Sequence, residues 1–489
     1  MEAETEVLPV NLQSIAKPQS LLLPSKDTLI VLLALAVGCA VWTMPPFTPL
    51  GAKGMHFLAT MTVAVTLWVL EVFDEYIVAL MLLLSWVVFG IVPAKVALAG
   101  FSENSWFFTV GALGIAAAIG KTSLLERLAL KLLRWIPIHC QKTYTLFLLG
   151  AGVLSGPLLP TGKARAAVAV PVSQAIIQAA GFGPRSNGSA ALSLSAFIGF
   201  SQMSFMFLTA SSHCLLAWNF LTPAHKAEFG WLSWLLAALP AGACIAVFMF
   251  ISVRFLLPSS PHGKDNLNAK AVHAPLVNLG PISRKEWITL TTLIVTVAGW
   301  LTTSSHGINE AWVAVASLLV FLLAGVLDKE SFKTDLDWGL ILFFGVVISL
   351  GVVADYLKID AWFITIHGRF LADFADNPFS FLLVVFLLVS LVRFILHKTP
   401  TTALFALILV PLSERIGIHP GVMIIAMLMT TECFLLGYQD GPYNVAYSGG
   451  GGSAFSHGQA RKILAAKYLA TLLALAVSVP YWMFLGFIR

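Results

Sequence analysis

The sequence predicts an all-α, polytopic membrane protein built from two inverted repeats, and two observations lead to this fold class. First, hydrophobic residues make up 58% of the 489 residues and charged residues only 11%, whereas soluble domains carry about a quarter charged residues. Second, the stretches 103–136 and 335–371 share one order of features. Each has polar residues, a tryptophan (Trp106 or Trp338), a glycine-punctuated apolar run and an amphipathic stretch that ends in cations. Internal duplication in a very apolar chain is typical of secondary transporters.

Apolar segments that approach the ~20 residues needed to cross a bilayer follow one another along the chain. They are residues 28–46, 56–72, 76–93, 106–120, 143–159, 164–181, 190–220, 231–257, 286–304, 309–327, 338–356, 378–396, 401–414, 420–447 and 464–488. More than ten segments are therefore embedded in the membrane. Because some are too short to cross it, we expect re-entrant hairpins among them.

The remaining composition restricts the class of protein further. The net charge of +5 is modest and the cations lie mostly between apolar segments, as membrane topology requires, so nucleic acid is not an expected partner. The five cysteines are scattered without a CxxC pair, which predicts neither a disulfide framework nor a zinc site. No cleavable signal peptide is recognisable, and we expect an integral, multi-pass protein of the cell (inner) membrane.

Polar segments divide the chain into four parts. We predict a cytoplasmic tail at 1–27, a first transmembrane repeat at 28–257, a cytoplasmic linker at 258–285 and a second repeat at 286–489. The linker is rich in Pro, Ser, Asn and Gly. The amphipathic stretches 121–136 and 357–371 are expected to lie along the membrane surface.

Each half also contains an apolar–polar–apolar unit with a short polar tip. The first tip contains Thr161, Gly162, Lys163 and Arg165, and the second contains residues 397–402 with Lys398. A helix that begins at membrane depth exposes unpaired N–H groups and a partial positive charge, which attract anions. The two tips therefore predict an anion site near the bilayer midplane, to which the tip cations contribute full charges.

The segments TGKARAAVAVP (161–171) and HKTPTTAL (397–404) resemble the two Ser-Asn-Thr tips of the divalent anion:sodium symporter family. The segments 205–218 and 434–452 resemble that family's unwound stretches, and 67–84 resembles a segment near its N-terminus. The resemblance implies re-entrant hairpins, broken transmembrane helices, and a transport core that moves against a scaffold in an elevator mechanism. It also implies a homodimer and a small anionic substrate such as a dicarboxylate, citrate or sulfate.

Carried over position by position, the resemblance gives a set of candidate substrate-binding residues. They are Thr161, Gly162, Lys163, Arg165, Thr209, Ser211, Ser212, His213, His397, Lys398, Thr399, Thr401, Tyr438, Gln439, Asp440, Gly441 and Pro442.

The tip lysines depart most from the family pattern. A lysine ammonium donates three hydrogen bonds and accepts none, so it cannot serve as a sodium ligand. Our hypothesis is that Lys163 and Lys398 replace two sodium ions as fixed counter-charges for the substrate. The alternative is that they extend to an interface or pair with acids such as Asp440. No cofactor or metal is predicted, and sodium stays an alternative ligand.

Asp440 stands where relatives carry a threonine, and three interpretations stay open. It neutralises Lys398, it carries a proton for coupling, or it binds the amine of a zwitterionic substrate. Glu432 is a second candidate for a buried acid. His213 either donates to a substrate carboxylate, titrates near neutral pH, or is an ordinary structural donor.

These features favour a carrier of di- or tricarboxylates that operates without sodium, as an exchanger, a uniporter or with protons. A sodium- or proton-coupled symporter of sulfate or an amino-acid-like substrate is the alternative. An intramembrane enzyme and a channel are the competing classes. The chain lacks HExxH and GxSxG motifs, and polar clusters at two matched tips suit a carrier better than a channel.

Overall fold

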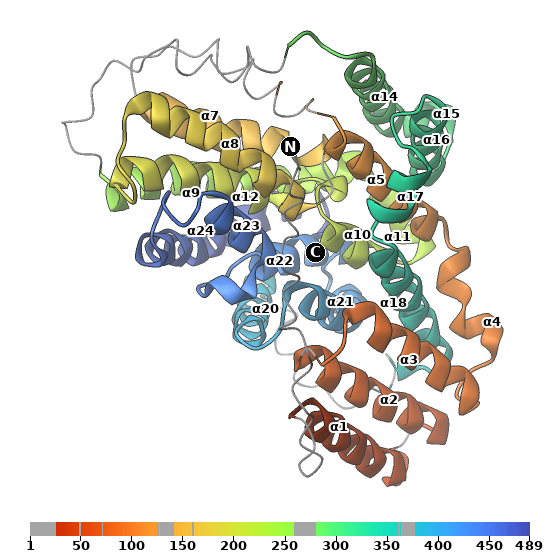
Figure 1. The fold of residues 1–489 in the computed structure, drawn as a ribbon. Coiled ribbons are helices and arrows are strands. Elements are labelled where there is room, and N and C mark those ends of the chain that lie inside the picture. The colour runs from red at the N-terminus through yellow and green to blue at the C-terminus, as the bar shows by residue number, and fades with distance from the viewer. Residues whose placement is uncertain are drawn as a thin grey trace, which may run out of the picture.

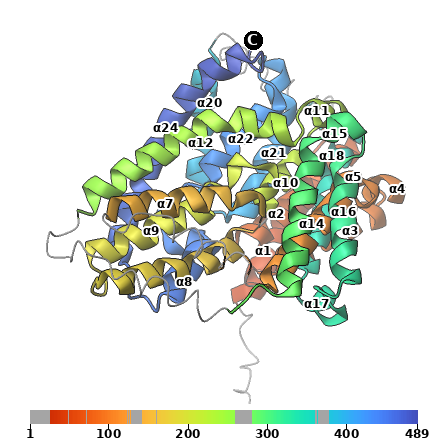
Figure 2. The ribbon, with the colours of Figure 1, turned by 90° about the horizontal axis from the view of Figure 1, so that it is seen from above.

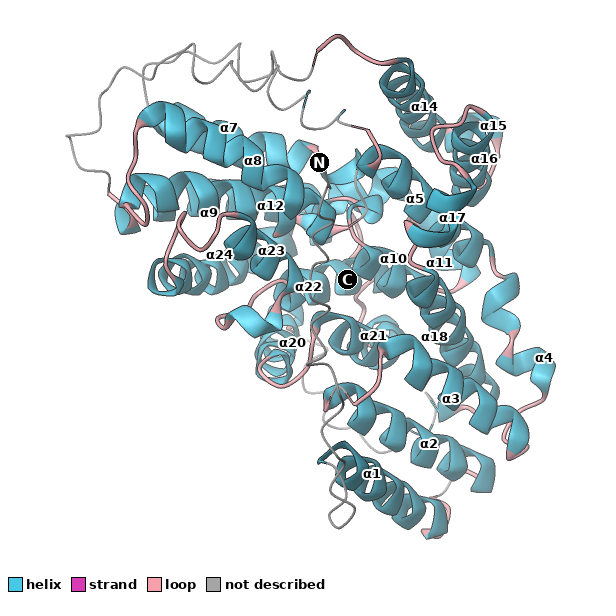
Figure 3. Ribbon diagram, viewed as in Figure 1, coloured by secondary structure: helices cyan, strands magenta, loops and turns pink. Residues whose placement is uncertain are grey.

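The computed structural model describes residues 26–489 except 48–49, 71, 123, 125–126, 128–140, 159–160, 259–279, 360–361 and 363–376. Every regular element in these residues is a helix (Figure 3). The predicted tail at 1–27 and linker at 258–285 lie almost wholly outside the described residues, as do most of the two surface stretches. Predictions about these segments therefore stay predictions.

The first half of the chain contains twelve α or 3₁₀ elements before its long closing helices, and they follow one another as listed here in chain order. They are α1 (Lys26–Thr43), α2 (Ala52–Val69), α3 (Glu75–Val88), α4 (Ala94–Ala97), η1 (Ala99–Ser102), α5 (Asn104–Gly120), α7 (Gln141–Leu154), η2 (Gly156–Leu158), α8 (Gly162–Ala180), α9 (Asn187–Ser201), η3 (Ser204–Met206), η4 (Leu208–Ala210), α10 (Ser212–Asn219), α11 (Pro223–Glu228) and α12 (Trp231–Leu256).

The second half repeats much of this order. It contains α14 (Arg284–Leu301), α15 (Thr303–His306), α16 (Glu310–Leu323), α17 (Lys329–Thr334), α18 (Trp338–Tyr356), α20 (Pro378–Arg393), α21 (Lys398–Arg415), α22 (Pro420–Thr431), η5 (Gly437–Gln439), α23 (Gly441–Gly449) and α24 (His457–Phe484). In order along the chain, α5 corresponds to α18, the pair α7–α8 to α20–α21, α9 and α10 to α22 and α23, and α12 to α24. The opposite orientation of the two halves in a membrane stays a prediction.

Five apolar segments among the described residues are long enough to cross a membrane, namely 52–69, 187–206, 231–256, 338–356 and 457–484. Seven shorter apolar helices of 10–17 residues accompany them. The two longest segments that composition marks as continuous, 190–220 and 420–447, are interrupted. The first breaks at η3 and η4, and the second breaks around η5.

The helices form two groups that Figures 1 and 2 both separate. We call α1–α5 with α14–α18 the scaffold group, and α7–α9 with α12, α20 and α22–α24 the core group. Helices α10 and α21 lie between them and pack against each other. Both groups contain helices from both halves of the chain.

Helix pairs from opposite halves join the structure together. Helix α5 packs on α16, α18 on α3, α8 on α23 and α12 on α24. The two duplicated stretches also touch directly, because Trp106 Nε1 donates to the carbonyl oxygen of Ile341 at 3.1 Å. At the end of α5, Lys121 pairs with Asp335 at 3.1 Å.

Close packing of α5 against α16 depends on a glycine. A Cβ atom on Gly111 would lie 2.7 Å from the Cβ of Ala314, which is closer than carbon atoms approach in packed interiors. Any larger residue at position 111 would force the two helices of the scaffold group apart.

A buried ion pair fixes the start of the second half. The side chain of Ser283 caps α14 in a capping box with Glu286, and Glu286 Oε1 also accepts from Arg127 Nε at 2.9 Å. Arg127 further donates to the carbonyl oxygen of Gly280 at 2.6 Å. The last residues before α14 are thus held on the first half of the chain, and the helix begins two residues before the predicted boundary.

Candidate functional site

The first tip precedes α8, at the end of the unit formed by α7, η2 and α8. Thr161 is the N-cap residue of α8, and its Oγ1 accepts from the backbone N–H of Ala164 at 3.3 Å. Ser201, at the end of α9, donates its hydroxyl to the carbonyl oxygen of Gly162 at 3.1 Å. The Lys163 side chain is exposed and forms no ion pair with any described residue.

The second tip joins α20 to α21. His397 is the N-cap residue of α21 without a side-chain capping bond, and Lys398 is the first residue of the helix. The Lys398 ammonium lies 3.4 Å from Oε1 of Glu432. Thr399 Oγ1 lies 3.2 Å from Nε2 of His213, whereas the Thr401 hydroxyl is turned back onto the carbonyl oxygen of His397 at 2.8 Å.

The two tips share their cap position but not the position of their lysine. Lys398 is the first helical residue after its cap, and Lys163 is the second after its own cap. One residue corresponds to about 100° around a helix, so the two ammonium groups leave their helices in different directions. This offset explains why Lys398 reaches Glu432 and Lys163 is exposed.

Each tip lies between the broken helices of both halves. Ser201 of α9 contacts the first tip, and a Cβ on Gly162 would lie 3.1 Å from Pro442 Cγ at the start of α23. A Cβ on Gly441 would lie only 2.6 Å from Cε of Lys163. The second tip likewise contacts the end of α22 through Glu432 and the start of α10 through His213.

His213 marks the place where the two tips converge. Its Nδ1 lies 2.9 Å from the Oγ of Ser211, which is the N-cap residue of α10. The fields of Lys398 and Lys163 both act on this imidazole, together with that of Arg393. The structure therefore brings together Lys163, Ser211, His213, Lys398, Thr399, Gly441 and Pro442 of the predicted set, with Ser212 beside His213.

Asp440 does not pair with Lys398, so this interpretation of Asp440 is wrong. Asp440 is the N-cap residue of α23, and its Oδ1 accepts from the backbone N–H of Tyr443 at 2.9 Å and from Nε2 of Gln202 at 3.2 Å. Glu432 is the acid that Lys398 contacts. A carboxylate at a helix N-terminus is favoured by the unpaired N–H groups and the helix dipole, which accounts for a buried acid at position 440.

Arg165 was predicted to bind substrate directly, and its contacts do not fit that role. Its side chain is 1% exposed, and it donates to the carbonyl oxygens of Phe200 and Ala210 and, at 2.8 Å, to Ser204 Oγ. These groups belong to the end of α9 and to the unwound segment that follows. The guanidinium thus holds the backbone of the first broken helix.

Arg393, which sequence reasoning missed, does the same in the second half. It donates to the carbonyl oxygens of Thr431 and Gln439, both at 2.9 Å, and of Leu396 at 2.8 Å. Thr431 ends α22 and Gln439 precedes the cap of α23. Each half therefore has one buried arginine across its broken helix, but Arg165 comes from the second arm of its hairpin and Arg393 from the first.

Three further predicted residues make structural contacts. The hydroxyl of Thr209 accepts from Trp231 Nε1 at 3.2 Å, and the Tyr438 hydroxyl donates to the carbonyl oxygen of Phe394 at 2.9 Å. The Gln439 amide donates to the carbonyl oxygen of Arg393 at 2.6 Å and accepts from two backbone N–H groups. These side chains shape the surroundings of the site and do not face its centre.

A buried polar network connects the two tips through residues that the sequence did not single out. Lys467 of α24 donates to Gln202 Oε1 at 3.0 Å and to the carbonyl oxygen of Glu432 at 2.9 Å. Gln202 in turn donates to Asp440, and the Glu432 carboxylate contacts Lys398. Lys467 is 1% exposed and lies among apolar residues in the sequence, so only its charge within an apolar run could have drawn attention to it.

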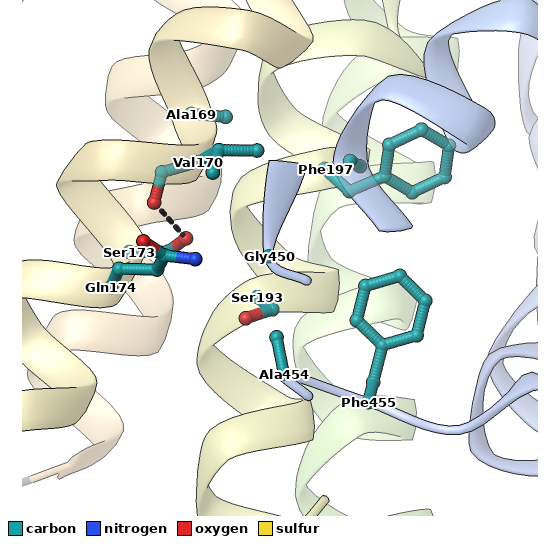
Figure 4. A pocket seen from close by; sticks show the side chains of 10 residues that line it. Ala169, Val170, Ser173, Gln174, Ser193, Phe197, Gly450, Ala454 and Phe455 are labelled. Atoms are coloured by element: carbon teal, nitrogen blue, oxygen red, sulfur yellow. Dashed lines mark hydrogen bonds between the residues drawn. The ribbon is translucent and has the colours of Figure 1, made fainter. Parts of the chain in front are cut away.

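A small cavity between α8, α9 and α23 lies beside this region (Figure 4). Its walls include Ser173, Gln174 and Ser193, with Phe197 and Phe455 on the other side. It has room for about one water molecule, so it is too small for a carboxylate substrate. Among the described residues, no group of three or more His, Cys, Asp or Glu side chains could hold a metal ion.

Comparisons with known proteins give one family and one fold. The family model described as "Sodium:sulfate symporter transmembrane region" matches residues 25–488. A membrane protein of Cupriavidus necator is 26% identical over 413 residues, which cover 79% of this chain and 78% of that protein. The chloroplastic dicarboxylate transporter 2 of Spinacia oleracea is 27% identical over 280 residues, which cover 55% of this chain and 49% of that protein.

Among solved structures, the chain is similar to the YdaH transporter of Alcanivorax borkumensis. The TM-score is 0.56 at 14% identity, and the match covers 94% of this chain and 98% of that chain. At this identity the likeness concerns the fold alone.

Proposed function

The chain belongs to the sodium:sulfate symporter family, and from this premise we propose that it is a carrier of small organic anions, most favourably di- or tricarboxylates. As a member of this family it is a multi-pass membrane protein and a secondary transporter. The proposal concerns its substrate, its coupling and its motion.

The observation that carries the proposal is the pair of lysines at the starts of α8 and α21. Lys163 and Lys398 stand at helix N-termini, where unpaired N–H groups and the helix dipole attract anions. Both ammonium groups act on the same imidazole, His213. Two cations beside two helix ends suit a substrate with two separated negative groups, and charge-assisted hydrogen bonds to carboxylates are strong. The name of the chloroplastic dicarboxylate transporter supports this substrate class.

We further propose that transport is independent of sodium. Each tip already carries a permanent cation that cannot leave the protein, so it cannot transmit the energy of an ion gradient. An exchanger, a uniporter, or a carrier that couples to protons through Asp440 or His213 fits this arrangement. The family description favours one alternative, a sodium-coupled symporter of sulfate.

The two helix groups support an elevator motion. The tips, the broken helices and the polar network belong to the core group or to the helices α10 and α21 beside it. The scaffold group contributes none of the polar residues that meet at His213. We propose that the core group moves against the scaffold group and carries the anion with it.

A thermal-stability screen tests substrate and coupling together. Purified protein is heated with succinate, citrate, sulfate or aspartate, each as the sodium salt and as the choline salt. A ligand that binds only the folded protein raises the unfolding temperature. We expect stabilisation by succinate or citrate of equal size in the two salts. Stabilisation by sulfate that requires sodium would instead support the alternative, and no stabilisation by any anion would contradict the anion site.

Substitution of the tip lysines tests the same site. Lys163→Ala and Lys398→Ala should each weaken binding of succinate about 10- to 100-fold, since a charge-assisted hydrogen bond contributes ~1.5–3 kcal/mol. Lys462→Ala, which removes an exposed lysine near the start of α24, is the matched control and should bind like the wild type. Normal binding by both tip variants would show that these lysines are structural.

A further inference from the structure

Glu432 occupies an unusual position beside the second tip. It is the C-cap residue of α22 and is 2% exposed. Its carboxylate lies between two lysines from different helices, 3.4 Å from Lys398 Nζ and 3.9 Å from Lys467 Nζ. A buried carboxylate is costly unless it is paired, so the partner that satisfies it matters.

Lys467 does not depend on this carboxylate. Its ammonium already donates to Gln202 Oε1 at 3.0 Å and to the main-chain oxygen of Glu432 at 2.9 Å. The separation of 3.9 Å from Oε2 is beyond hydrogen-bond range, and Oε2 has no hydrogen-bond partner among the described residues. The only hydrogen bond of the carboxylate in this part of the chain is therefore the one it receives from Lys398.

The bond between Lys398 and Glu432 is long and leaves both groups unsatisfied. At 3.4 Å it lies outside the usual range for a charged N–H donor. A lysine has three donors, and the described residues offer Lys398 this single acceptor. The Lys398 side chain is 14% exposed and stands at a helix start that no side chain caps. An incoming carboxylate would meet both the ammonium and the unpaired N–H groups of α21.

We propose that Glu432 is a tethered counter-ion that holds Lys398 between substrates and that a carboxylate of the substrate displaces it. This inference depends on the proposed function, because it assumes that Lys398 binds the transported anion. In the exchange, one charge-assisted contact is replaced by another without a change in covalent bonds. Glu432 thus competes with the substrate inside the protein and sets its apparent affinity.

The first tip lacks such a competitor, which gives the site a preference. Gln202 is the C-cap residue of α9, as Glu432 is of α22, and its amide carries no charge. Lys163 is therefore open to any anion, whereas Lys398 must first lose Glu432. A monocarboxylate binds at Lys163 without displacing Glu432. A dicarboxylate reaches both lysines, and only its second group bears the cost of displacement.

The test measures the dissociation constant of succinate for Glu432 variants by titration calorimetry. If Lys398 is free about one tenth of the time, the apparent affinity is reduced about tenfold. Glu432→Gln should then bind succinate up to about tenfold tighter than the wild type. Glu432→Asp should also bind more tightly, because it keeps the charge but its shorter side chain cannot reach Lys398. Butyrate, which has one carboxylate, should bind all three proteins alike.

Two further variants separate displacement from a general effect of charge. In a Lys398→Met background, Glu432→Gln should give no further tightening, since the contact under test is absent. Glu414→Gln removes an exposed carboxylate on the same helix as Lys398, one that pairs with His225 at 3.1 Å, and should leave the affinity unchanged. Size-exclusion profiles and unfolding temperatures identify variants that do not fold, and Glu432→Asp carries the test if Glu432→Gln fails.

The outcomes are distinct. If Glu432→Asp binds succinate no more tightly than the wild type, displacement is refuted, even if Glu432→Gln tightens through loss of charge. Tightening that persists without Lys398 also refutes it. If the wild type binds succinate through Lys398 while the Glu432 variants show no gain, the proposed function stands and this inference alone fails. If the wild type binds no dicarboxylate, both fail.

Discussion

At the scale of single residues, the two tip lysines are alike in sequence and different in structure. A cation at each tip is predictable, because each tip interrupts an apolar run. The partner of each cation is not predictable, because it comes from a distant helix end. Glu432 lies 34 residues after Lys398 in the chain and reaches it at 3.4 Å only because α21 and α22 pack together.

Gly441→Ala tests whether the position of Lys163 matters for binding. The added Cβ would lie 2.6 Å from Lys163 Cε, the flexible end of that side chain, so the lysine moves and the backbone does not. Alanine is also the better helix former, by ~1 kcal/mol, and Gly441 is the first residue of α23. We expect weaker binding of succinate, by at least about threefold, with an unfolding temperature that is equal or higher.

Gly150→Ala is the control for this substitution. It adds a Cβ on α7 where no atom lies within 4 Å, and it should change neither affinity nor stability adversely. Unchanged affinity in Gly441→Ala would mean that Lys163 does not contact the anion.

The residues that sequence reasoning missed share one physical cause. Lys467, Gln202 and Arg393 lie inside or at the ends of apolar runs, and each is satisfied by groups from another helix. Arg165 shows the opposite error, since a cation beside a tip suggests a ligand contact but its guanidinium is used by main-chain oxygens. Which donor faces a ligand and which faces the backbone depends on packing that residue type does not encode.

At the scale of elements, the broken helices are the feature that most needs support. A helix that ends inside the protein leaves carbonyl groups without partners, and buried carbonyls need donors. Arg165 and Arg393 supply them in the two halves. Composition alone marks 190–220 and 420–447 as continuous apolar runs, so the breaks were predicted only through the family resemblance, and they are confirmed.

Arg393→Lys tests this support at the second break. A lysine cannot reach the three carbonyl oxygens that Arg393 binds, those of Leu396, Thr431 and Gln439. Each buried carbonyl without a donor costs ~1–3 kcal/mol, so we expect a loss of at least ~2 kcal/mol in stability, seen as a lower unfolding temperature. Transport should slow while the order of preference among anions is kept.

Arg415→Lys provides the comparison, because Arg415 is exposed at the end of α21 and its replacement should have no effect on stability. An Arg393→Lys protein that melts with the wild type would show that the second break does not need the guanidinium. A changed order of anion preference would instead place Arg393 in contact with the substrate.

At the scale of the whole molecule, the duplication in the sequence predicts two similar halves but not how they interlock. The helix order recurs, and yet the closest partners of α5, α8 and α12 belong to the other half. Hydrophobic periodicity cannot encode such pairing, because each apolar face is compatible with many partners. The scaffold and core groups thus cut across the two halves, and this division is the structural basis for the proposed motion.

Cross-linking the two groups tests the elevator motion. At the start of α12, a Cβ on Gly230 would lie 3.2 Å from Oε1 of Glu310, at the start of α16, so this contact joins the core group to the scaffold group. In a variant without other cysteines, Gly230→Cys with Glu310→Cys is treated with a short thiol-reactive cross-linker and reconstituted into liposomes. We expect loss of succinate uptake in cross-linked protein while succinate still binds, because binding needs only the tips and delivery needs relative movement. The control is Thr296→Cys with Ser317→Cys, which joins α14 to α16 within the scaffold group where the two hydroxyl oxygens are 2.6 Å apart. That link should leave uptake intact, and full uptake by the protein cross-linked between positions 230 and 310 would mean that the two groups do not move past each other at this contact.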